Sequence, residues 1–167
     1  AATNGHLDIL RWLRTNGCPW DSDTCTNAAA NGHLNVLQWA RAKGCEWNRR
    51  TTSAAAEKGH LHIIEWAHAN GGQFFNDFAT YYAIKGGGHL HILEWALSHN
   101  FYQNPEIYSR AIFYNQFHVL EWAWKNNYPV SSHACATAAE LGNLPIFKWL
   151  HKRKFPWDYY VLQRAIN

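Results

Sequence analysis

The strongest pattern along the chain is an amphipathic segment that returns at a nearly fixed interval. It reads GHLNVLQWA at residues 32–40, GHLHIIEWA at residues 59–67 and GHLHILEWA at residues 88–96. Counted from the glycine, apolar residues stand at offsets 2, 4, 5, 7 and 8, which form one face of a helix with 3.6 residues per turn. The pattern therefore predicts the same amphipathic helix several times.

The tryptophan of this segment sets the period. Successive tryptophans are separated by 27, 27, 29, 27 and 27 residues, and a period in this range is typical of a repeat array. One helix pair cannot bury its Trp and Leu face alone, so stacked pairs are expected to share a core that contains the tryptophans. The interval of 29 falls at IKGGGHL (residues 84–90), where extra glycines are expected to lengthen a tight turn. The six tryptophans are Trp12, Trp39, Trp66, Trp95, Trp122 and Trp149.

Each unit is also expected to contain a first helix with smaller packed side chains, which ends at the glycine that opens the tryptophan-containing segment. Segments such as TCTNAAANG (residues 24–32) place Cys and paired Ala on its packed side. Asn115 replaces the turn glycine once, and Asn tolerates the left-handed conformation better than other non-glycine residues. The expected N-cap residues share one position of the unit, and their side-chain oxygens suit a helix start. They are Asp21, Asn48, Asn104, Ser131 and Asp158.

These elements predict an all-α fold, an α-solenoid of about six stacked antiparallel helix pairs. The whole chain, residues 1–167, is expected to be a single repeat domain and a fragment of a longer protein, because both ends fall in mid-unit. The expected units are roughly 1–20, 21–47, 48–74, 75–103, 104–130 and 131–157, with residues 158–167 as a terminal helix.

The helix, glycine turn and GHLxVLxWAxxxG segment resemble ankyrin repeats. The resemblance rests on paired alanines four residues before the turn glycine, as in Ala28-Ala29 before Gly32 and Ala55-Ala56 before Gly59. The units are about six residues shorter than usual ankyrin units and lack the Thr-Pro-Leu-His opening, so the β-hairpin fingers are expected to be shortened or absent. Short tryptophan-rich units of this kind resemble those of giant DNA viruses and protists. The resemblance implies a binding scaffold, sometimes attached to ubiquitin-ligase adaptor segments.

Composition narrows the class of protein without naming a partner. The formal net charge of +3 is modest and scattered, no apolar run is long enough to span a bilayer, and the N-terminus has no signal-peptide pattern. Four cysteines are too few for a disulfide scaffold, which favours reduced thiols in an intracellular, cytoplasmic setting. For a viral protein this would be the host cytoplasm. We expect no membrane partner, and the oligomeric state stays open.

The eleven histidines suggest a metal site, but their spacing argues against one. Equivalent residues of stacked helices lie about 8–10 Å apart, too far for two ligands of one Zn²⁺. His60 and His62 are two residues apart, which on a helix places them on different faces. We therefore interpret the position of His33 and His60 as a hydrogen-bonding helix start, and that of His62, His91 and His118 as a solvent-facing strip that could sense pH.

No residue set predicts catalysis. A Ser/His/Asp or Cys/His arrangement outside the repeat pattern and a phosphate-binding glycine loop are both missing from the sequence. The repeated Glu65, Glu94 and Glu121 suggest a solvated stripe. We therefore expect no enzyme activity, no catalytic residue, no metal and no cofactor.

A partner site is predicted where the units depart from the average. The aromatic residues are denser between residues 74 and 128 than the core positions can accommodate, and exposed aromatic residues with Arg are enriched at protein interfaces. The alternative is that these side chains only fill space beside Gly86–Gly88. The predicted partner-binding residues, on the face of the first helices, are Tyr81, Tyr108, Arg110 and Tyr114.

Two other functions remain open. Basic residues at Arg49, Arg50, Lys58 and residues 151–154 (HKRK), together with aromatic side chains, could bind nucleic acid. The solenoid could also be a purely structural arm with no separable partner. The favoured interpretation is a protein–protein interaction module that could serve as the substrate-recognition arm of a larger protein, with nucleic acid as the less expected partner.

Overall fold

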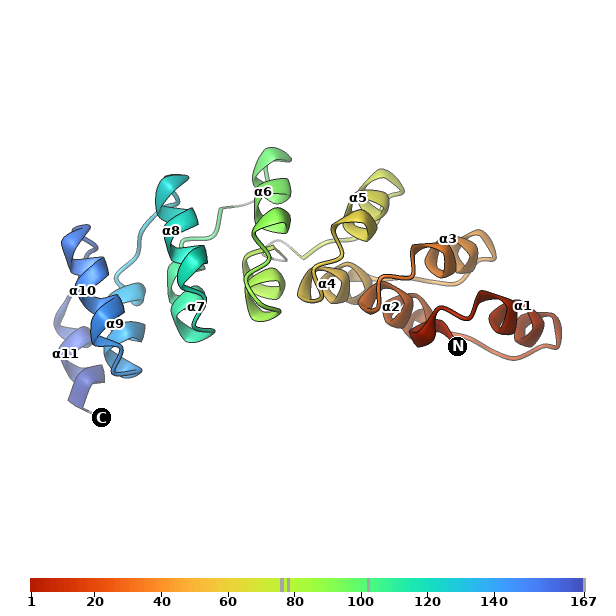
Figure 1. Cartoon of the computed structure of the whole chain (residues 1–167), viewed down its shortest axis with the longest axis horizontal. Coiled ribbons are helices and arrows are strands. Elements are labelled where there is room, and N and C mark those ends of the chain that lie inside the picture. The colour runs from red at the N-terminus through yellow and green to blue at the C-terminus, as the bar shows by residue number, and fades with distance from the viewer. Residues whose placement is uncertain (76, 78, 102, 167) are drawn as a thin grey trace.

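The computed structural model describes residues 1–75, 77, 79–101 and 103–166, and this part of the chain forms a row of helix pairs (Figure 1). A short 3₁₀ helix, η1 (Ala2–Asn4), comes first, and no strand occurs in the described ranges. The first helices of the units are α2 (Ser22–Ala30), α4 (Arg49–Glu57), the π-helix η2 (Ala79–Ala83), α7 (Ile107–Phe113), α9 (His133–Glu140) and α11 (Tyr159–Ile166). The second helices are α1 (Leu7–Thr15), α3 (Leu34–Ala42), α5 (Leu61–Ala69), α6 (Leu90–Ser98), α8 (Phe117–Lys125) and α10 (Leu144–Lys152). The predicted fold class, an all-α solenoid of about six stacked helix pairs, is confirmed.

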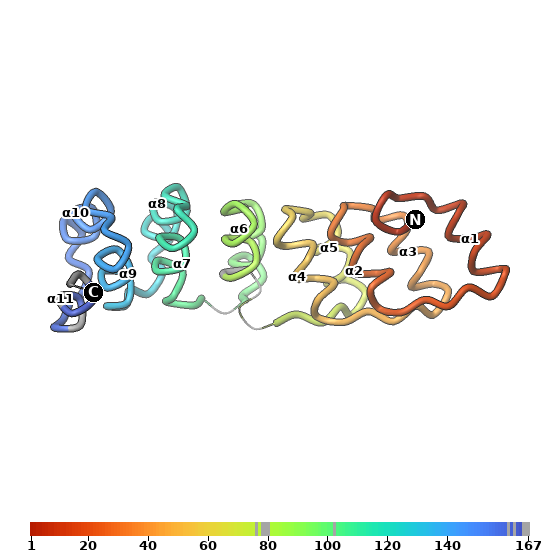
Figure 2. Tube along the Cα trace, turned by 90° about the horizontal axis from the view of Figure 1, so that it is seen from below, coloured from red at the N-terminus to blue at the C-terminus, as the bar shows by residue number. Residues whose placement is uncertain are grey.

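The stack is a gentle arc with the first helices on its inner edge. Figure 1 shows α2, α4, α7, α9 and α11 along the lower, concave edge, and α3, α5, α6, α8 and α10 along the upper edge. The closest packing between units is made by first helices, α2 on α4, α7 on α9 and α9 on α11. Their packed sides carry small side chains, whereas Trp and Ile separate the second helices, so the stack bends toward the first helices. Figure 2 shows the two termini at opposite ends of the row.

Left-handed residues end the helices where the pattern predicts them. Gly32 (φ 76°) and Asn115 (φ 56°) hold the same turn between first and second helix, which confirms Asn115 as the replacement for glycine. After the second helix the left-handed residue is Gly17, Gly44 or Gly71 in the early units and Asn100, Asn127 or Lys154 in the later ones.

The unit with the longer period takes up its two extra residues at two places. Ala55 and Ala83 are both fully buried at one position of the unit and are 28 residues apart, one more than the usual 27. The first extra residue therefore lies before Ala83, in η2, which has the wider turn of a π-helix. The other lies in the turn, since His89 N–H donates to Ala83 O, six residues back, whereas His60 N–H donates to Ala55 O, five residues back. The predicted lengthening of the turn therefore accounts for one residue of the two.

Four of the turn glycines, Gly5, Gly32, Gly59 and Gly88, lie against a histidine ring of the next unit, whereas none of the described atoms lies within 4 Å of a Cβ position at Gly142. A Cβ atom at these four glycines would lie within about 3 Å of the ring, so a larger residue would displace it. The first three pairs, with the Cβ-to-ring distance, are Gly5–His33 (2.8 Å), Gly32–His60 (2.9 Å) and Gly59–His89 (3.0 Å). His33 Nε2–H donates to Thr3 O at 3.0 Å, and His89 Nε2–H to Glu57 O at 3.1 Å. We call this arrangement the glycine–histidine contact; it ties the starts of α3, α5 and α6 to the preceding turn.

The second set of histidines is exposed, as the spacing predicts, but each ring also bonds to the preceding unit. His62, His91 and His118 donate from Nε2 to the carbonyls of Gly32, Gly59 and Gly88 at 3.2, 3.0 and 2.9 Å. The rings of His60 and His62 meet edge to face, with centroids 5.8 Å apart. The prediction that they lie on different faces is wrong because His60 is the N-cap residue, outside the helix that begins at Leu61.

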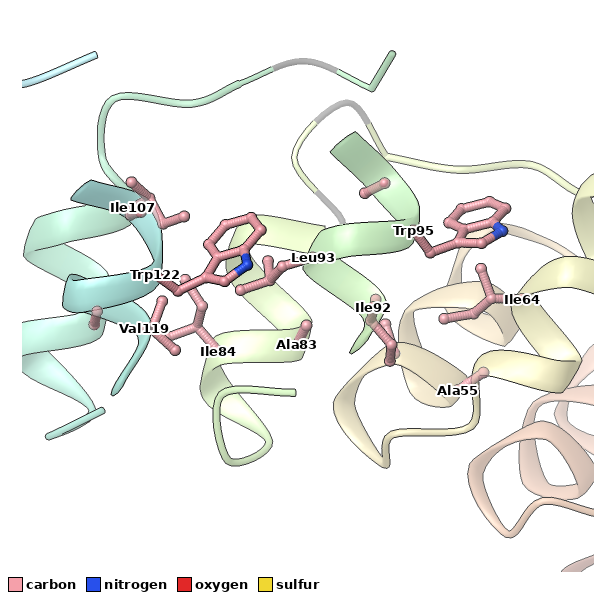
Figure 3. Close-up of a cluster of buried hydrophobic side chains, with 14 of the residues drawn as sticks. Ala55, Ile64, Ala83, Ile84, Ile92, Leu93, Trp95, Ile107, Val119 and Trp122 are labelled. Carbon is pink, nitrogen blue, oxygen red and sulfur yellow. The ribbon is translucent and has the colours of Figure 1, made fainter. Parts of the chain in front are cut away.

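The tryptophans of the period lie between units, but they are not buried equally. Trp95 and Trp122 are 8% and 9% exposed. Figure 3 shows the indole of Trp95 beside Ile64 and that of Trp122 beside Leu93, each on the preceding second helix. Burial of such a ring can contribute several kcal/mol at about 25 cal/mol per Å².

The remaining tryptophans depart from the prediction of a uniform core. Trp39 and Trp66 are half-buried and meet Trp20 and Trp47 of the preceding units edge-on, with ring centroids 5.5 and 5.4 Å apart. Trp12, on α1, is 64% exposed. The position is therefore an interface between units, and its burial depends on the neighbouring unit.

Helix starts follow the predicted caps with two exceptions. The Asp21 and Asn48 side chains accept from Asp23 N–H and Arg50 N–H at 2.9 and 2.8 Å, and α11 begins directly after Asp158. Asn104 accepts from Glu106 N–H at 2.9 Å, but it is not the N-cap residue, because α7 begins two residues later than predicted, after Glu106. Ser131 is not a cap: α9 begins after Ser132, and the buried Ser131 hydroxyl has no hydrogen-bond partner within the described ranges. None of the described helices is long and apolar enough to cross a membrane.

Candidate functional site

A groove of about 490 Å³ opens on the inner face between η2 and α11. It is lined by successive first helices, because one position of each unit points toward it: Tyr81 on η2, Arg110 on α7, Thr137 on α9 and Arg164 on α11. The other lining residues are Glu106, Ser109, Phe113, Tyr114, His133, Glu140 and Leu141.

Three of the four residues predicted to bind a partner lie together in this groove. Tyr81, Arg110 and Tyr114 all line it and are partly exposed. Phe78 and Tyr102, two of the aromatic residues of the same region, lie outside the described residues.

The fourth residue, Tyr108, is in the core, and its prediction as an exposed contact is wrong. It is fully buried, its hydroxyl donates to Tyr128 O at 3.2 Å, and its ring meets Phe155 edge-on at 4.7 Å. Burial, together with the neighbouring Tyr128, raises the pKa of the Tyr108 hydroxyl to about 12. Tyr108 stands three residues before the buried Ala111, the position held by the buried Cys25 before Ala28, so the repeat pattern itself marks it as an inward side chain.

The positive charge of Arg110 in the groove is compensated by a carboxylate. Arg110 Nη1 donates to Asp77 Oδ2 at 3.0 Å, and its guanidinium lies 5.1 Å from the centre of the Tyr81 ring. Burial, together with a hydrogen bond to Tyr81, raises the pKa of the Tyr114 hydroxyl, which therefore stays protonated at neutral pH. Arg110 thus stacks on Tyr81, which in turn is hydrogen-bonded to Tyr114, and the guanidinium charge is neutralised by Asp77.

Two further ion pairs line the groove. His133 Nδ1 lies 2.6 Å from Glu106 Oε1, and the Ser109 hydroxyl donates to Glu106 Oε2 at 2.8 Å. Burial favours a higher pKa for Glu106, but the hydrogen bonds from His133 and Ser109 outweigh it, so this carboxyl has a pKa below its ordinary value. Arg164 Nη1 donates to Glu140 Oε2 at 2.7 Å. Each of these acids belongs to the unit before its base, so charge is balanced across the groove.

The most exposed apolar residues of the groove are Phe113 and Leu141, which the sequence analysis did not select. Phe113 is 64% exposed and Leu141 48% exposed. A signal for both was present: other units hold Ala30 or Glu57 at the position of Phe113, and Asn31 or Lys58 at that of Leu141. An apolar residue at a position that is polar or small elsewhere was the clue.

The possibility of a metal site can be examined for the part of the chain that the structure describes. No group of three or more His, Cys, Asp or Glu side chains within the described ranges is arranged to hold an ion. The paired histidines direct Nε2 at backbone carbonyls, as described above. The arrangement of the groove is therefore suited to contact with apolar and hydrogen-bonding groups.

The architecture defines a class, the helical-repeat α-solenoids, in which short helix pairs stack in one dimension. Among solved structures, the chain resembles the pentatricopeptide repeat protein PPR10 from maize, with a TM-score of 0.52 and 11% sequence identity. The match covers 95% of this chain and 28% of that one. No protein-family model and no curated protein matches the sequence. At this identity the likeness shows the fold alone: the chain is a helical-repeat protein, and ankyrin kinship is not shown.

Proposed function

We propose that the protein is a protein–protein interaction module whose inner-face groove binds an extended apolar segment of a partner protein. The observation that carries this proposal is the exposure of Phe113 and Leu141 beside Tyr81 and Tyr114 in one groove. Exposed apolar residues gathered in one place on a folded surface are typical of interaction sites. Tyr and Arg are the side chains most enriched among the residues that dominate such interfaces.

The charge distribution favours a protein over nucleic acid as the partner. Arg50 pairs with Asp23 at 3.8 Å and Lys85 with Glu57 at 3.2 Å, which continues the order of acid in one unit and base in the next. Arg49 and Arg153, two of the residues in the nucleic-acid hypothesis, lie over the rings of Phe75 and Trp149. Nucleic-acid affinity comes largely from uncompensated Lys and Arg on phosphates, and these side chains are engaged within the fold.

Ankyrin kinship is the finer part of the proposal. Its support is the glycine turn between two short helices and the burial of Ala28-Ala29 and Ala55-Ala56 where first helices pack. Insertion of the six missing residues between Gly44 and Trp47, as an ankyrin-type hairpin, would then be tolerated with unchanged helix content by circular dichroism. Loss of cooperative unfolding would place the units outside that family.

We further propose that the module acts as a recognition arm of a larger cytoplasmic protein, without catalysis of its own. The four free cysteines suit a reducing compartment. A repeat scaffold presents side chains from successive units to one partner and needs no reactive group of its own.

The test is selection of binding peptides from a random peptide library by the immobilised chain, repeated with a Phe113→Ala/Leu141→Ala variant. Both residues are exposed, so the variant should fold normally. The matched control is Ile9→Ala, since Ile9 is 52% exposed at the far end of the row, on α1. We expect apolar peptides that bind the wild type and the control at high salt, with at least about tenfold weaker binding to the groove variant, since a hot-spot contact is worth about 1–2 kcal/mol.

Equal binding to all three chains would exclude the groove as the site. Binding of a single-stranded oligonucleotide that is lost at high salt and unaffected by the groove substitutions would favour the nucleic-acid function instead. A Tyr81→Ala/Arg110→Ala variant then measures how much the stacked Tyr81–Arg110 pair contributes to peptide affinity.

A further inference from the structure

Two buried thiols meet inside the second unit. Cys25 lies on α2 and Cys45 in the connector after α3, and they are 0% and 1% exposed. Both are free, and the interaction between the two thiols is the largest cause of the shift in the pKa of each. Cys45 Sγ also donates to Asp21 O, the N-cap residue of α2, at 3.2 Å. The pair therefore lies over the first turn of α2, away from the groove.

The repeat architecture explains why these two residues meet. In the third and fifth units, the side chain three residues before the buried alanine points at the connector that follows the second helix. In the third unit Thr52 Oγ1 donates to Gln73 O at 2.6 Å, and in the fifth Tyr108 OH donates to Tyr128 O. In the second unit this contact is made by two cysteines. A comparison of repeat-equivalent cysteines alone, such as Cys18 with Cys45, does not find the pair.

The surroundings make the two thiols unequal. Arg41 Nη1 donates to Cys45 O at 2.6 Å, and its guanidinium lies 4.7 Å from the Trp47 ring, so a cation is fixed beside the pair. The interaction with Cys25 lowers the pKa of the Cys45 thiol, and the Arg41 charge lowers it further against the effect of burial. The same interaction, together with burial, raises the pKa of the Cys25 thiol. Cys45 is thus the sulfur that ionises first, and thiolate is the form that reacts.

We propose that Cys25 and Cys45 are a redox-active dithiol that hydrogen peroxide converts into an intrachain disulfide. In the first step the Cys45 thiolate attacks one peroxide oxygen: an S–O bond forms, the O–O bond breaks, and hydroxide leaves. Cys45 is then a sulfenic acid, and the peroxide has been reduced. In the second step Cys25 Sγ attacks Cys45 Sγ: the S–S bond forms, the S–O bond breaks, and the Cys25 proton leaves with the hydroxide as water.

The disulfide joins the first turn of α2 to the connector after α3 and so closes the second unit covalently. A crosslink restricts the unfolded chain, so the oxidised protein should unfold at a higher temperature. Burial restricts access to small oxidants that enter when the connector opens locally. The exposed Cys18 is the internal reference for unhindered oxidation.

The test uses the full chain with Cys18→Ser, which leaves three of the four free cysteines. The folded protein is treated with hydrogen peroxide, the remaining thiols are alkylated in denaturant, and the digest is analysed by mass spectrometry. We expect one alkylated cysteine, Cys135, and a peptide pair that joins Cys25 to Cys45 and has lost two hydrogens. Dithiothreitol should restore three thiols and reverse the rise in unfolding temperature.

Two variants separate the native contact from general reactivity. In Cys25→Ala, Cys45 should stop at a sulfenic acid that dimedone traps, and Cys45→Ala should leave Cys25 as a thiol. Oxidation in urea should give mixed linkages that include Cys135. The proposal is overturned if both thiols remain alkylatable after a treatment that oxidises Cys18 in the wild type, or if Cys45 is driven to sulfinic acid while Cys25 stays reduced. Peptide binding in the groove is a separate readout, so failure here leaves the proposed function untouched.

Discussion

The third and fifth units, which lie on either side of the unit of η2, have the same helix pair but place side chains of different size against the connector. At the position three residues before the buried alanine, the third unit has Thr52 and the fifth has Tyr108, whereas the second and sixth units both have a cysteine, Cys25 and Cys135. Thr52 and Tyr108 nevertheless make the same bond, from a side-chain hydroxyl to a carbonyl of the connector. The comparison shows that the repeat conserves a bonding geometry, while the volume of the side chain that provides it varies.

The polarity of the inner face differs between the units before η2 and the later units that line the groove. The residue directly before the turn glycine is Asn4, Asn31 or Lys58 in the early units, whereas Tyr114 and Leu141 stand at this position near the groove. The early units thus form a regular polar frame, and apolar contact surface is concentrated in the later ones. The predictions below test whether the two regions differ in stability and in chemistry as their side chains indicate.

The largest expected effect comes from truncation of the position that differs most in volume. Tyr108→Ala removes a fully buried ring, and we expect a loss of about 4 kcal/mol in the free energy of unfolding. Thr52→Ala at the equivalent position removes one hydrogen bond and should cost about 1 kcal/mol. Urea unfolding measures both, and equal losses would contradict the difference drawn between the regions.

A smaller effect is expected from the glycine–histidine contact. Gly32 and Gly44 have nearly the same φ, 76° and 81°, but a Cβ atom at Gly32 would meet the His60 ring, whereas none of the described atoms lies within 4 Å of one at Gly44. Gly44→Ala should cost about 1 kcal/mol for the left-handed conformation alone. Gly32→Ala should cost at least about 1 kcal/mol more, because the ring must move. A His60→Ala background should bring the two costs together, and a persistent gap would show that the ring is not the cause.

The histidines should make the early units sensitive to acid. Burial, aided by the charges of His62, His33 and His89, lowers the pKa of His60 from its ordinary value of 6.5. The unfolded chain therefore binds more protons, so stability is full above about pH 6.5 and falls as the pH drops below it. Hydrogen exchange of α3 and α5 amides between neutral and acidic pH should show this loss, and His60→Gln should reduce it. Acid effects confined to the later units would refute this account.

The smallest effect should follow removal of the outermost ion pair. Arg50 and Asp23 are 3.8 Å apart, and their side chains are 73% and 59% exposed, so Arg50→Ala should change stability by less than about 0.5 kcal/mol. Arg110→Ala also removes the cation–π contact with the Tyr81 ring and should lower the free energy of unfolding by about 1 kcal/mol. Thermal unfolding of the two variants side by side would show whether inner-face charge matters more near the groove.

The period, the helix pairs and most caps could be predicted from the sequence, because they depend on residues close together in one unit. The contacts between units could not be predicted as well. The exposed position of His62 could be predicted, but its bond to Gly32 O could not, because that carbonyl belongs to another unit. Tyr108 was taken for a surface residue because aromatic density was weighed above its position in the repeat. Cys25 and Cys45 were missed because their contact joins two different positions of the unit.

Every histidine bond described above reaches back by about one unit. His33 to Thr3, His62 to Gly32 and His118 to Gly88 each span 30 residues, and His91 to Gly59 spans 32. A chain pulled from its two ends would therefore not lose its structure in one event. Units would detach one after another, each release breaking only the bonds to its neighbour, so the molecule would lengthen in steps of one repeat and could shorten again in the same steps.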